Sequence, residues 1–227
     1  MSDEPILEFQ KTLNAVFGNC QPLFSVSQKT TGNNTSTIAE PAPDLSIEDF
    51  AKTLAHCMNC RMHIGRGQIC FGRGNPQAKI WFVGDFPSLD DDKLGTVFSA
   101  DVGDLLQKMI SAMKLHTEEV YFANLFKCRR PEGLKITETE IQSCAKFFEQ
   151  QWAYGKPEIL VALGEIPARS FSRSEMPLHA LRGQDDHHWK TSQLFCTHHP
   201  RDLLQNTSLK KECWTDLQKV MKALGRL

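Results

Sequence analysis

The sequence has no long apolar run and almost no net charge. Among its 227 residues, 26 Lys and Arg stand against 27 Asp and Glu, which gives a formal net charge of −1. No stretch approaches the roughly 18 to 20 apolar residues that a membrane-spanning helix needs. An integral membrane protein is therefore not expected. Because the net charge is so small, no overall field draws the chain to nucleic acid, and any such contact must use a local patch.

The amino terminus lacks the basic stretch and apolar core of a secretory signal. It reads Met1-Ser2-Asp3-Glu4-Pro5, which is acidic. We therefore expect a soluble, cytoplasmic protein. In a reducing compartment the eight cysteines are better explained as metal ligands or buried thiols than as disulfides. Cys70 and Cys196 lie in apolar runs, which favours buried free thiols at those two positions.

Three segments differ in composition. Residues 1–24 contain Ile6, Phe9 and Leu13 at helical spacing, which predicts a short amphipathic helix. Residues 25–45 are polar and punctuated by proline, as in a flexible linker. Residues 46–227 then form the globular domain, and Ser46 with Asp49 resembles a capping box that opens a helix running to the first cysteine pair.

The globular part alternates short apolar runs with longer amphipathic segments. The apolar runs are residues 80–83, 120–123, 159–163 and 194–197, and the amphipathic segments lie near 102–114, 137–153, 165–172 and 208–224. Continuous apolar strands separated by helices are typical of a parallel sheet that is covered on both faces. The sequence therefore predicts an α/β fold, a three-layer α/β/α sandwich around a central four-stranded, mainly parallel sheet.

A residue with a polar side chain, or in one case a glycine, follows each predicted strand. Asp85 follows the first, Asn124 the second, Gly164 the third, and His198 and His199 the fourth. In open parallel sheets the ligand binds beyond the carboxyl ends of the strands. An acid, an amide and an imidazole at one rim predict a functional site there.

Four cysteines have the spacing of metal ligands. Cys57 and Cys60 form a C-x2-C pair, and Cys128 and Cys144 lie sixteen positions apart. Thiolates bind zinc and iron–sulfur clusters. The second pair is too widely spaced for a zinc ribbon, which favours a cluster, while a zinc site remains the alternative.

Many landmarks of the sequence occur together in one known family. They are Cys57-x2-Cys60 with Arg66, Phe71-Gly72-Arg73-Gly74-Asn75-Pro76, Gly95-x2-Phe98, Asn124-Leu125-Phe126-Lys127-Cys128-Arg129-Arg130-Pro131, Cys144, Leu181-Arg182-Gly183 and Thr197-x-His199-Pro200. In these residues, from about Cys57 to Leu224, the chain resembles the iron–sulfur, or family four, uracil-DNA glycosylases of the uracil-DNA glycosylase superfamily.

The resemblance implies an activity and a cofactor. The chain would hydrolyse the N-glycosidic bond of deoxyuridine in DNA, with a 4Fe-4S cluster on Cys57, Cys60, Cys128 and Cys144. Two motifs depart from the family. Gly84-Asp85-Phe86-Pro87-Ser88 stands where the family usually has Gly-Glu-Ala-Pro-Gly, and Val97-Phe98-Ser99-Ala100 where it usually has Pro-Phe-Val-Gly. The alternative is therefore a superfamily member of altered or lost activity that binds DNA or a partner.

The resemblance also assigns roles at the rim. Asn124 would recognise the uracil edge, Phe98 would stack on the flipped base, and Gly84 would contribute to the same pocket. His199 would hydrogen-bond uracil O2, and Asp85 would orient the attacking water. The competing interpretation of Asp85 is a helix N-cap, and that of His199 is a loop histidine.

Other residues are candidates for contact with DNA. Arg129, Arg130 and Arg201 would contact phosphates, and Leu203 or Leu204 would supply an apolar wedge into the gap left by the base. We expect a monomer. Residues 21–24, Gln-Pro-Leu-Phe, faintly resemble a sliding-clamp-binding peptide, although a packed loop explains them equally well.

Overall fold

The computed structural model describes residues 46–184 and 186–227. Its centre is a sheet in the order β1-β3-β2-β4-β6-β5. Four strands pair in parallel: β2 (Ile80–Gly84), β3 (Val120–Asn124), β4 (Ile159–Leu163) and β6 (Ser192–Thr197). All four coincide with the predicted apolar runs. Two antiparallel strands, β1 (Arg73–Gly74) and β5 (His188–Trp189), extend the edges of the sheet. They were not predicted, because a strand of two residues has no periodic pattern in the sequence.

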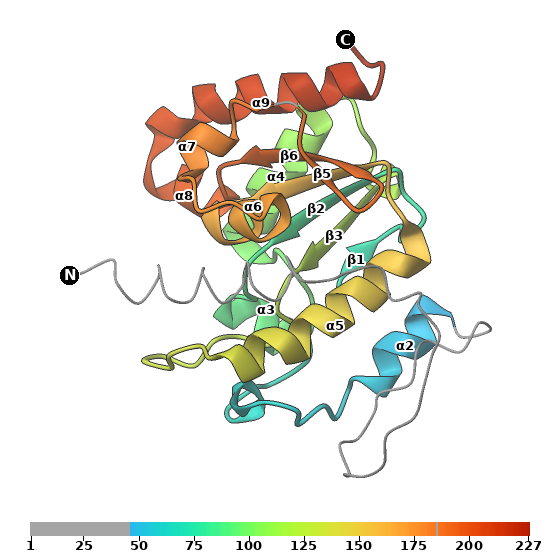
Figure 1. Cartoon of the computed structure of the whole chain (residues 1–227), viewed down its shortest axis with the longest axis vertical. Helices are drawn as coiled ribbons and strands as arrows, with labels where there is room; N and C mark the ends of the chain where they lie inside the picture. The colour runs from blue at the N-terminus through green and yellow to red at the C-terminus, as the bar shows by residue number, and fades with distance from the viewer. Residues whose placement is uncertain (1–45, 185) are drawn as a thin grey trace, which may run out of the picture.

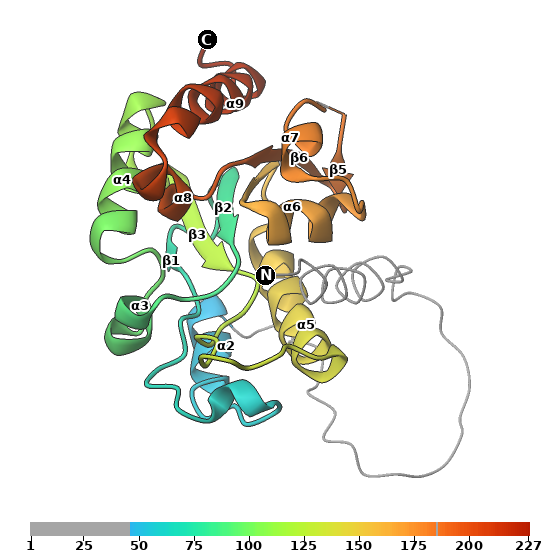
Figure 2. The same cartoon turned by 90° about the vertical axis from the view of Figure 1, so that its left-hand side faces the viewer.

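Helices cover both faces of the sheet, as the α/β/α prediction requires. Side chains alternate along a strand, so Trp81 and Val83 pack on one side, and Ile80 and Phe82 on the other. The first side is covered by α5 (Glu138–Gly155), α6 (Glu165–Ser172) and α7 (Leu178–Leu181), and the second by α4 (Ala100–Ala112), α8 (Pro200–Gln205) and α9 (Lys210–Ala223). Figure 2 shows these layers on either side of the sheet.

The longer predicted helices are present with shifted ends, and α6 begins and ends where expected. Helix α2 (Ile47–Thr53) starts at Ser46, whose hydroxyl accepts a hydrogen bond from the Asp49 N–H at 3.1 Å. The helix was predicted to reach Cys57 and ends earlier. The reason is local: the Leu54 N–H bonds the Ala51 carbonyl, three residues back, and the chain turns. Figure 1 shows α2 beside α5.

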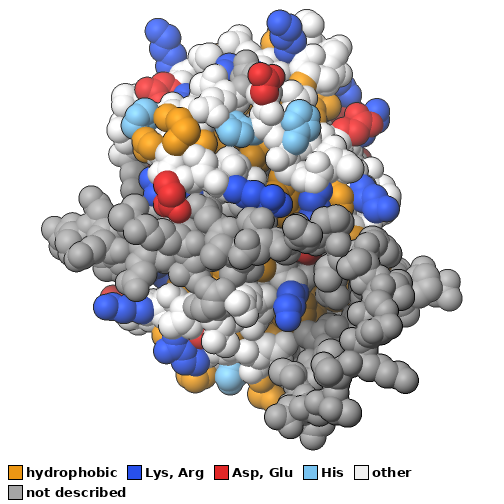
Figure 3. All heavy atoms as spheres, in the orientation of Figure 1, with side chains coloured by type: hydrophobic (Ala, Val, Ile, Leu, Met, Phe, Trp, Pro, Cys, Tyr) orange, Lys and Arg blue, Asp and Glu red, His pale blue; other side chains and the backbone are white. Residues whose placement is uncertain are grey.

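The predicted N-terminal helix (1–24), linker (25–45) and clamp-like segment (21–24) lie outside the described residues. None of the helices in residues 46–184 and 186–227 is long and apolar enough to cross a membrane. On the face drawn in Figure 3, basic side chains are spread among acidic and neutral ones. The visible described residues of this face therefore form no single large basic patch.

Candidate active site and cysteine pocket

The ends of the parallel strands bring the predicted rim residues together. Gly84 ends β2 and lies between Asn124 of β3 and Phe98 of the loop before α4. A Cβ atom at Gly84 would stand 2.5 Å from Asn124 Oδ1 and 2.9 Å from Phe98 Cζ. Because real Cβ atoms do not approach so closely, only glycine lets these two side chains meet here.

Asn124 has an unused hydrogen-bonding group at this rim. Its side chain is buried, and within the described structure its Oδ1 has no hydrogen-bond partner. A buried acceptor without a partner costs about 1–3 kcal/mol. The Asn124 backbone is held separately, since its carbonyl accepts a hydrogen bond from Lys127 Nζ at 2.7 Å. The side-chain oxygen is therefore free to accept from a ligand.

Phe98 adopts a strained backbone conformation. Its φ is +52°, a region that bulky residues rarely occupy. Two contacts hold it there: the Phe98 carbonyl accepts from Arg73 Nη2 at 3.0 Å, and Gly103 of α4 approaches that carbonyl so closely that an added Cβ would lie 2.0 Å away. Such strain is typical of functional sites. The Phe98 ring centre lies 5.7 Å from that of His199.

His199 is arranged as a neutral hydrogen-bond donor. It precedes α8, and its Nδ1 accepts from the Arg201 N–H at 3.0 Å, which leaves the proton of the neutral ring on Nε2. Burial lowers its pKa below the ordinary 6.5, against the opposing effect of Asp85. The neighbouring His198 points elsewhere, with Nε2 2.9 Å from Glu212 Oε2 on α9.

Asp85 faces His199 across a short gap. Its Oδ1 lies 3.9 Å from His199 Nε2 and accepts from the Phe86 N–H at 2.8 Å. Its Oδ2 is bound by Arg201 Nη2 at 3.1 Å. The helix-cap interpretation of Asp85 is wrong, because Ser88 is the N-cap of α3 (Leu89–Leu94).

The four residues expected to contact DNA have different environments. Arg130 is exposed and lies over the Phe86 ring, 5.5 Å from its centre. Arg201 pairs with Asp85. Arg129 is half-buried, with Nε 3.5 Å from Asp92 Oδ2 and Nη2 3.5 Å from the Gly65 carbonyl. This pairing gives Arg129 a structural contact that its sequence position did not reveal.

The wedge expected at Leu203 does not match the fold. Leu203 is 2% exposed and packs in the core under α4 and α9. A side chain that fills the core cannot enter a base stack. The next residue on α8, Leu204, is 45% exposed, so it is the one of the pair that faces outward.

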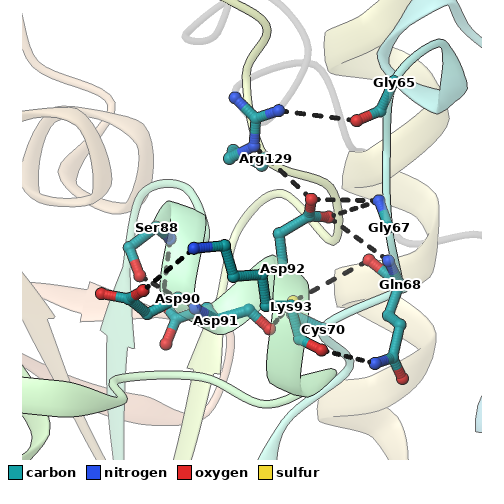
Figure 4. Close-up of polar contacts among 10 residues, drawn as sticks. All are labelled: Gly65, Gly67, Gln68, Cys70, Ser88, Asp90, Asp91, Asp92, Lys93 and Arg129. Atoms are coloured by element: carbon teal, nitrogen blue, oxygen red, sulfur yellow. Dashed lines mark hydrogen bonds and ion pairs between the residues drawn. The ribbon is translucent and has the colours of Figure 1, made fainter.

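Helix α3 contains two buried carboxylates, Asp91 and Asp92, that were not predicted from the sequence. Asp92 accepts from the Gly67 and Gln68 N–H groups, as Figure 4 shows. Asp91 accepts from the Ser99 N–H at 2.6 Å, next to Phe98. Helix α3 thus connects the segment after the C-x2-C pair to the Phe98 loop. In the sequence these residues belong to a run of three aspartates at 90–92. Such a run predicts exposed charge rather than buried hydrogen-bond acceptors.

The four predicted metal-ligating cysteines line one pocket. Its wall also includes Arg66, Lys127, Leu54 and Phe147. Cys57 and Cys60 come from the segment after α2, Cys128 from the loop after β3, and Cys144 from α5. Arg66 Nη1 donates to Cys128 Sγ at 3.4 Å and to the Cys57 carbonyl at 2.9 Å. A cation beside the thiols suits an anionic, thiolate-bound centre.

The thiols of this pocket influence one another. Burial raises the pKa of Cys144 to about 12 and also raises the pKa values of Cys60 and Cys128, and neighbouring thiols add to each shift. A metal centre must therefore displace their protons. Among the described residues, no three His, Cys, Asp or Glu side chains are grouped to hold one metal ion.

Lys127 links the two sites and was also missed. It is fully buried, lines the cysteine pocket, and donates to the Asn124 carbonyl and to Gln151 Oε1 at 2.5 Å. Burial lowers its pKa to about 7. From the sequence, a lysine next to a predicted cysteine ligand is expected at the surface. The burial of Lys127 was therefore not predicted, because it depends on tertiary packing.

Comparison with known proteins places the chain in a family. A model of the uracil DNA glycosylase superfamily matches residues 71–218. The Type-4 uracil-DNA glycosylase of Archaeoglobus fulgidus is 28% identical over 188 residues, covering 80% of this chain and 94% of the relative. The enzymes of that name from Sulfurisphaera tokodaii and Thermotoga maritima are each 29% identical, covering 77% and 76% of this chain and 83% and 92% of theirs. The chain belongs to the uracil DNA glycosylase superfamily.

Proposed function

We propose that this protein is a uracil-DNA glycosylase that hydrolyses the N-glycosidic bond of deoxyuridine in DNA. The observation that carries this proposal is the cluster of side chains at Gly84, where the unpaired Asn124 Oδ1, the Phe98 ring and the His199 ring converge beside Asp85. The names of the similar proteins support the same activity.

Recognition would use Asn124 and Phe98. The target base must leave the duplex stack and have its Watson–Crick edge read. The Asn124 Oδ1 accepts from uracil N3–H, and its amide N–H donates to uracil O4. The Phe98 ring lies next to Gly84 and supplies a stacking surface. Cytosine presents the reverse pattern at its edge, so a fixed Asn124 amide rejects it.

Chemistry would use His199 and Asp85. As the bond between C1′ and N1 breaks, its electron pair leaves with uracil, and charge develops on O2. The His199 Nε2–H donates to that oxygen, and such a donor typically lowers a barrier by about 3–4 kcal/mol. Asp85 orients the water whose oxygen bonds to C1′, accepts its proton, and stabilises the cationic sugar.

The cysteine pocket would hold a 4Fe-4S cluster on Cys57, Cys60, Cys128 and Cys144. When bound, the cluster cross-links three distant segments and thereby contributes folding free energy. Arg66 donates to the ligand Cys128. The cluster takes no part in the proposed bond cleavage, which uses the rim residues alone.

The experiment is incubation of the protein with a uracil-containing oligonucleotide, single- or double-stranded, followed by alkali cleavage. Cleavage at the uracil position supports the proposal, and the same oligonucleotide with thymine in that position is the control. If protein that retains full iron leaves both oligonucleotides intact, the alternative is correct: a superfamily member that binds DNA or a partner without excising uracil.

A further inference from the structure

Arg201 contacts both side chains to which we assign the chemistry. Its backbone N–H donates to His199 Nδ1 at 3.0 Å, and its guanidinium Nη2 lies 3.1 Å from Asp85 Oδ2. The Arg201 side chain is 45% exposed, whereas that of Asp85 is 13% exposed. The guanidinium therefore lies at the mouth of the site with the carboxylate behind it.

The Asp85 carboxylate is fixed by two contacts, one on each oxygen. The Phe86 N–H binds Oδ1, and Arg201 binds Oδ2. The first comes from the adjacent backbone and therefore does not relate the carboxylate to any other element of the fold. The second comes from α8, the helix that His199 precedes. Arg201 therefore sets the orientation of Asp85 relative to His199.

We infer that Arg201 is a positioning residue for Asp85 in the excision reaction, and that it is not primarily a phosphate contact. This inference rests on the proposed function. The charge of the guanidinium is already matched by a carboxylate, which leaves little of it for a DNA phosphate. Arg130 lies exposed over an aromatic ring, and no carboxylate among residues 46–184 and 186–227 forms an ion pair with it, so it is the better phosphate candidate.

A double-mutant cycle tests the inference. Single-turnover excision is measured with protein in excess for wild type, Arg201→Ala, Asp85→Asn and the double variant. We expect Arg201→Ala to slow excision roughly tenfold to a hundredfold, the usual cost of a misplaced catalytic group. The double variant should be no slower than Asp85→Asn, because Arg201 acts through Asp85. Arg201→Lys should recover part of the rate, and ethylguanidinium should partly rescue Arg201→Ala.

The matched control is Arg226→Ala, which removes another ion-paired, partly exposed arginine, bound to Glu119. Its excision rate should equal that of wild type. Independent losses at Arg201 and Asp85 would overturn the inference. So would an Arg201→Ala variant that only weakens DNA binding and reduces its salt dependence, since that is the behaviour of a phosphate contact.

The contact itself is measured without activity. NMR of the arginine guanidinium groups should show slow rotation for Arg201 in wild type and faster rotation in Asp85→Asn. If wild type excises no uracil, the proposed function fails, and NMR still decides on Arg201. A freely rotating Arg201 in wild type would refute the contact from which the inference starts.

Discussion

The rim site, which contains Gly84, Asn124 and His199, and the cysteine pocket are held in place by different parts of the fold. Gly84 and Asn124 are the last residues of paired parallel strands, and His199 follows a third strand closely. In the cysteine pocket, three of the four thiols come from irregular segments, and only Cys144 lies on a helix. The backbone ladder therefore fixes the rim, whereas the cysteine pocket depends on what the thiols bind. This difference predicts that the two sites respond separately to damage.

Removing one cysteine ligand should change the protein more than any other substitution proposed below. The loss of structure should be confined to the segments around the cysteine pocket. We expect Cys144→Ser to lose the cluster, because the remaining three thiolates cannot complete the site. The variant should therefore contain no iron and should lack the absorbance at ~400 nm. Hydrogen exchange should then accelerate in residues 54–66 and 125–147 and stay slow in β2, β4 and β6. Cys196→Ser, in a buried thiol away from the pocket, is the control for iron content. Equal acceleration across the sheet would contradict the separation of the two sites.

His199→Gln should slow excision by about 10²–10³-fold, the usual effect of losing a donor to developing charge. Iron content and hydrogen exchange in the cysteine pocket should not change. Because burial lowers the His199 pKa below 6.5, the neutral ring persists as the pH falls through 6.5. The wild-type rate should therefore hold from pH 7.5 to 6.5, as measured in single turnover. A rate that falls with an apparent pKa at or above 6.5 would show that His199 is not the neutral donor.

Gly84→Ala should slow excision by about 100-fold without unfolding the protein. The added methyl group displaces Asn124 or Phe98 by a distance on the order of 1 Å, a shift that typically costs that much. The overpacking should lower the free energy of unfolding by about 1–3 kcal/mol, with no added backbone strain, since Gly84 has an ordinary strand conformation. Gly183→Ala is the matched control, because its added Cβ would have only an ordinary contact, 3.6 Å from the Ala180 carbonyl. Equal rates in the two variants would contradict the pocket at Gly84.

Lys127→Met tests a residue that contacts both sites. It leaves the Asn124 carbonyl and Gln151 Oε1 without their donor, which should lower the free energy of unfolding by about 1–3 kcal/mol. We also expect uracil binding to weaken, because the Asn124 backbone loses its support. Urea unfolding measures the first effect and uracil inhibition of excision the second. A variant that is less stable but binds uracil normally would show that Lys127 serves the cysteine side alone.

Glu140→Gln should have the smallest effect. Burial would raise the Glu140 pKa, but hydrogen bonds from Arg61 and Thr137 outweigh it and hold the pKa at about 2. A carboxylate with a lowered pKa stabilises the fold above its ordinary value of 4.5, and this stability is lost as the pH falls toward 2. We therefore expect Glu140→Gln to cost about 1 kcal/mol at pH 7, with the difference from wild type narrowing below pH 4.5. A difference that is constant with pH would show that the charge of Glu140 is not involved.

The sequence predicted the rim better than its surroundings, for a physical reason. Four apolar runs specify the parallel strands, and the rule for strand ends then selects Asp85, Asn124, Gly164 and the pair His198 and His199 without any knowledge of packing. The resemblance to a family added Phe98. The positive φ of Phe98 and the approach of Gly103 that supports it could not be read from the sequence, because they arise from contacts between a loop and α4.

The burial of polar residues was the feature of the fold that the sequence predicted least well. Asp92 and Lys127 look like surface charges in sequence, yet both are buried, and each bonds a residue far along the chain, Asp92 to Gly67 and Lys127 to Gln151. Leu203 and Leu204 are equally apolar, and only the orientation of α8 decides which of them faces the core. Such outcomes depend on tertiary packing, which local patterns do not contain.

The central claim is that the pocket at Gly84 reads and releases uracil, and release of the free base tests it most directly. Wild type and Asn124→Asp are each incubated with duplexes that carry uracil or cytosine at one position, and the released base is identified by chromatography. We predict that wild type releases uracil and no cytosine, and that Asn124→Asp loses uracil release. Undiminished uracil release by Asn124→Asp, or none by wild-type protein with full iron, would contradict the account.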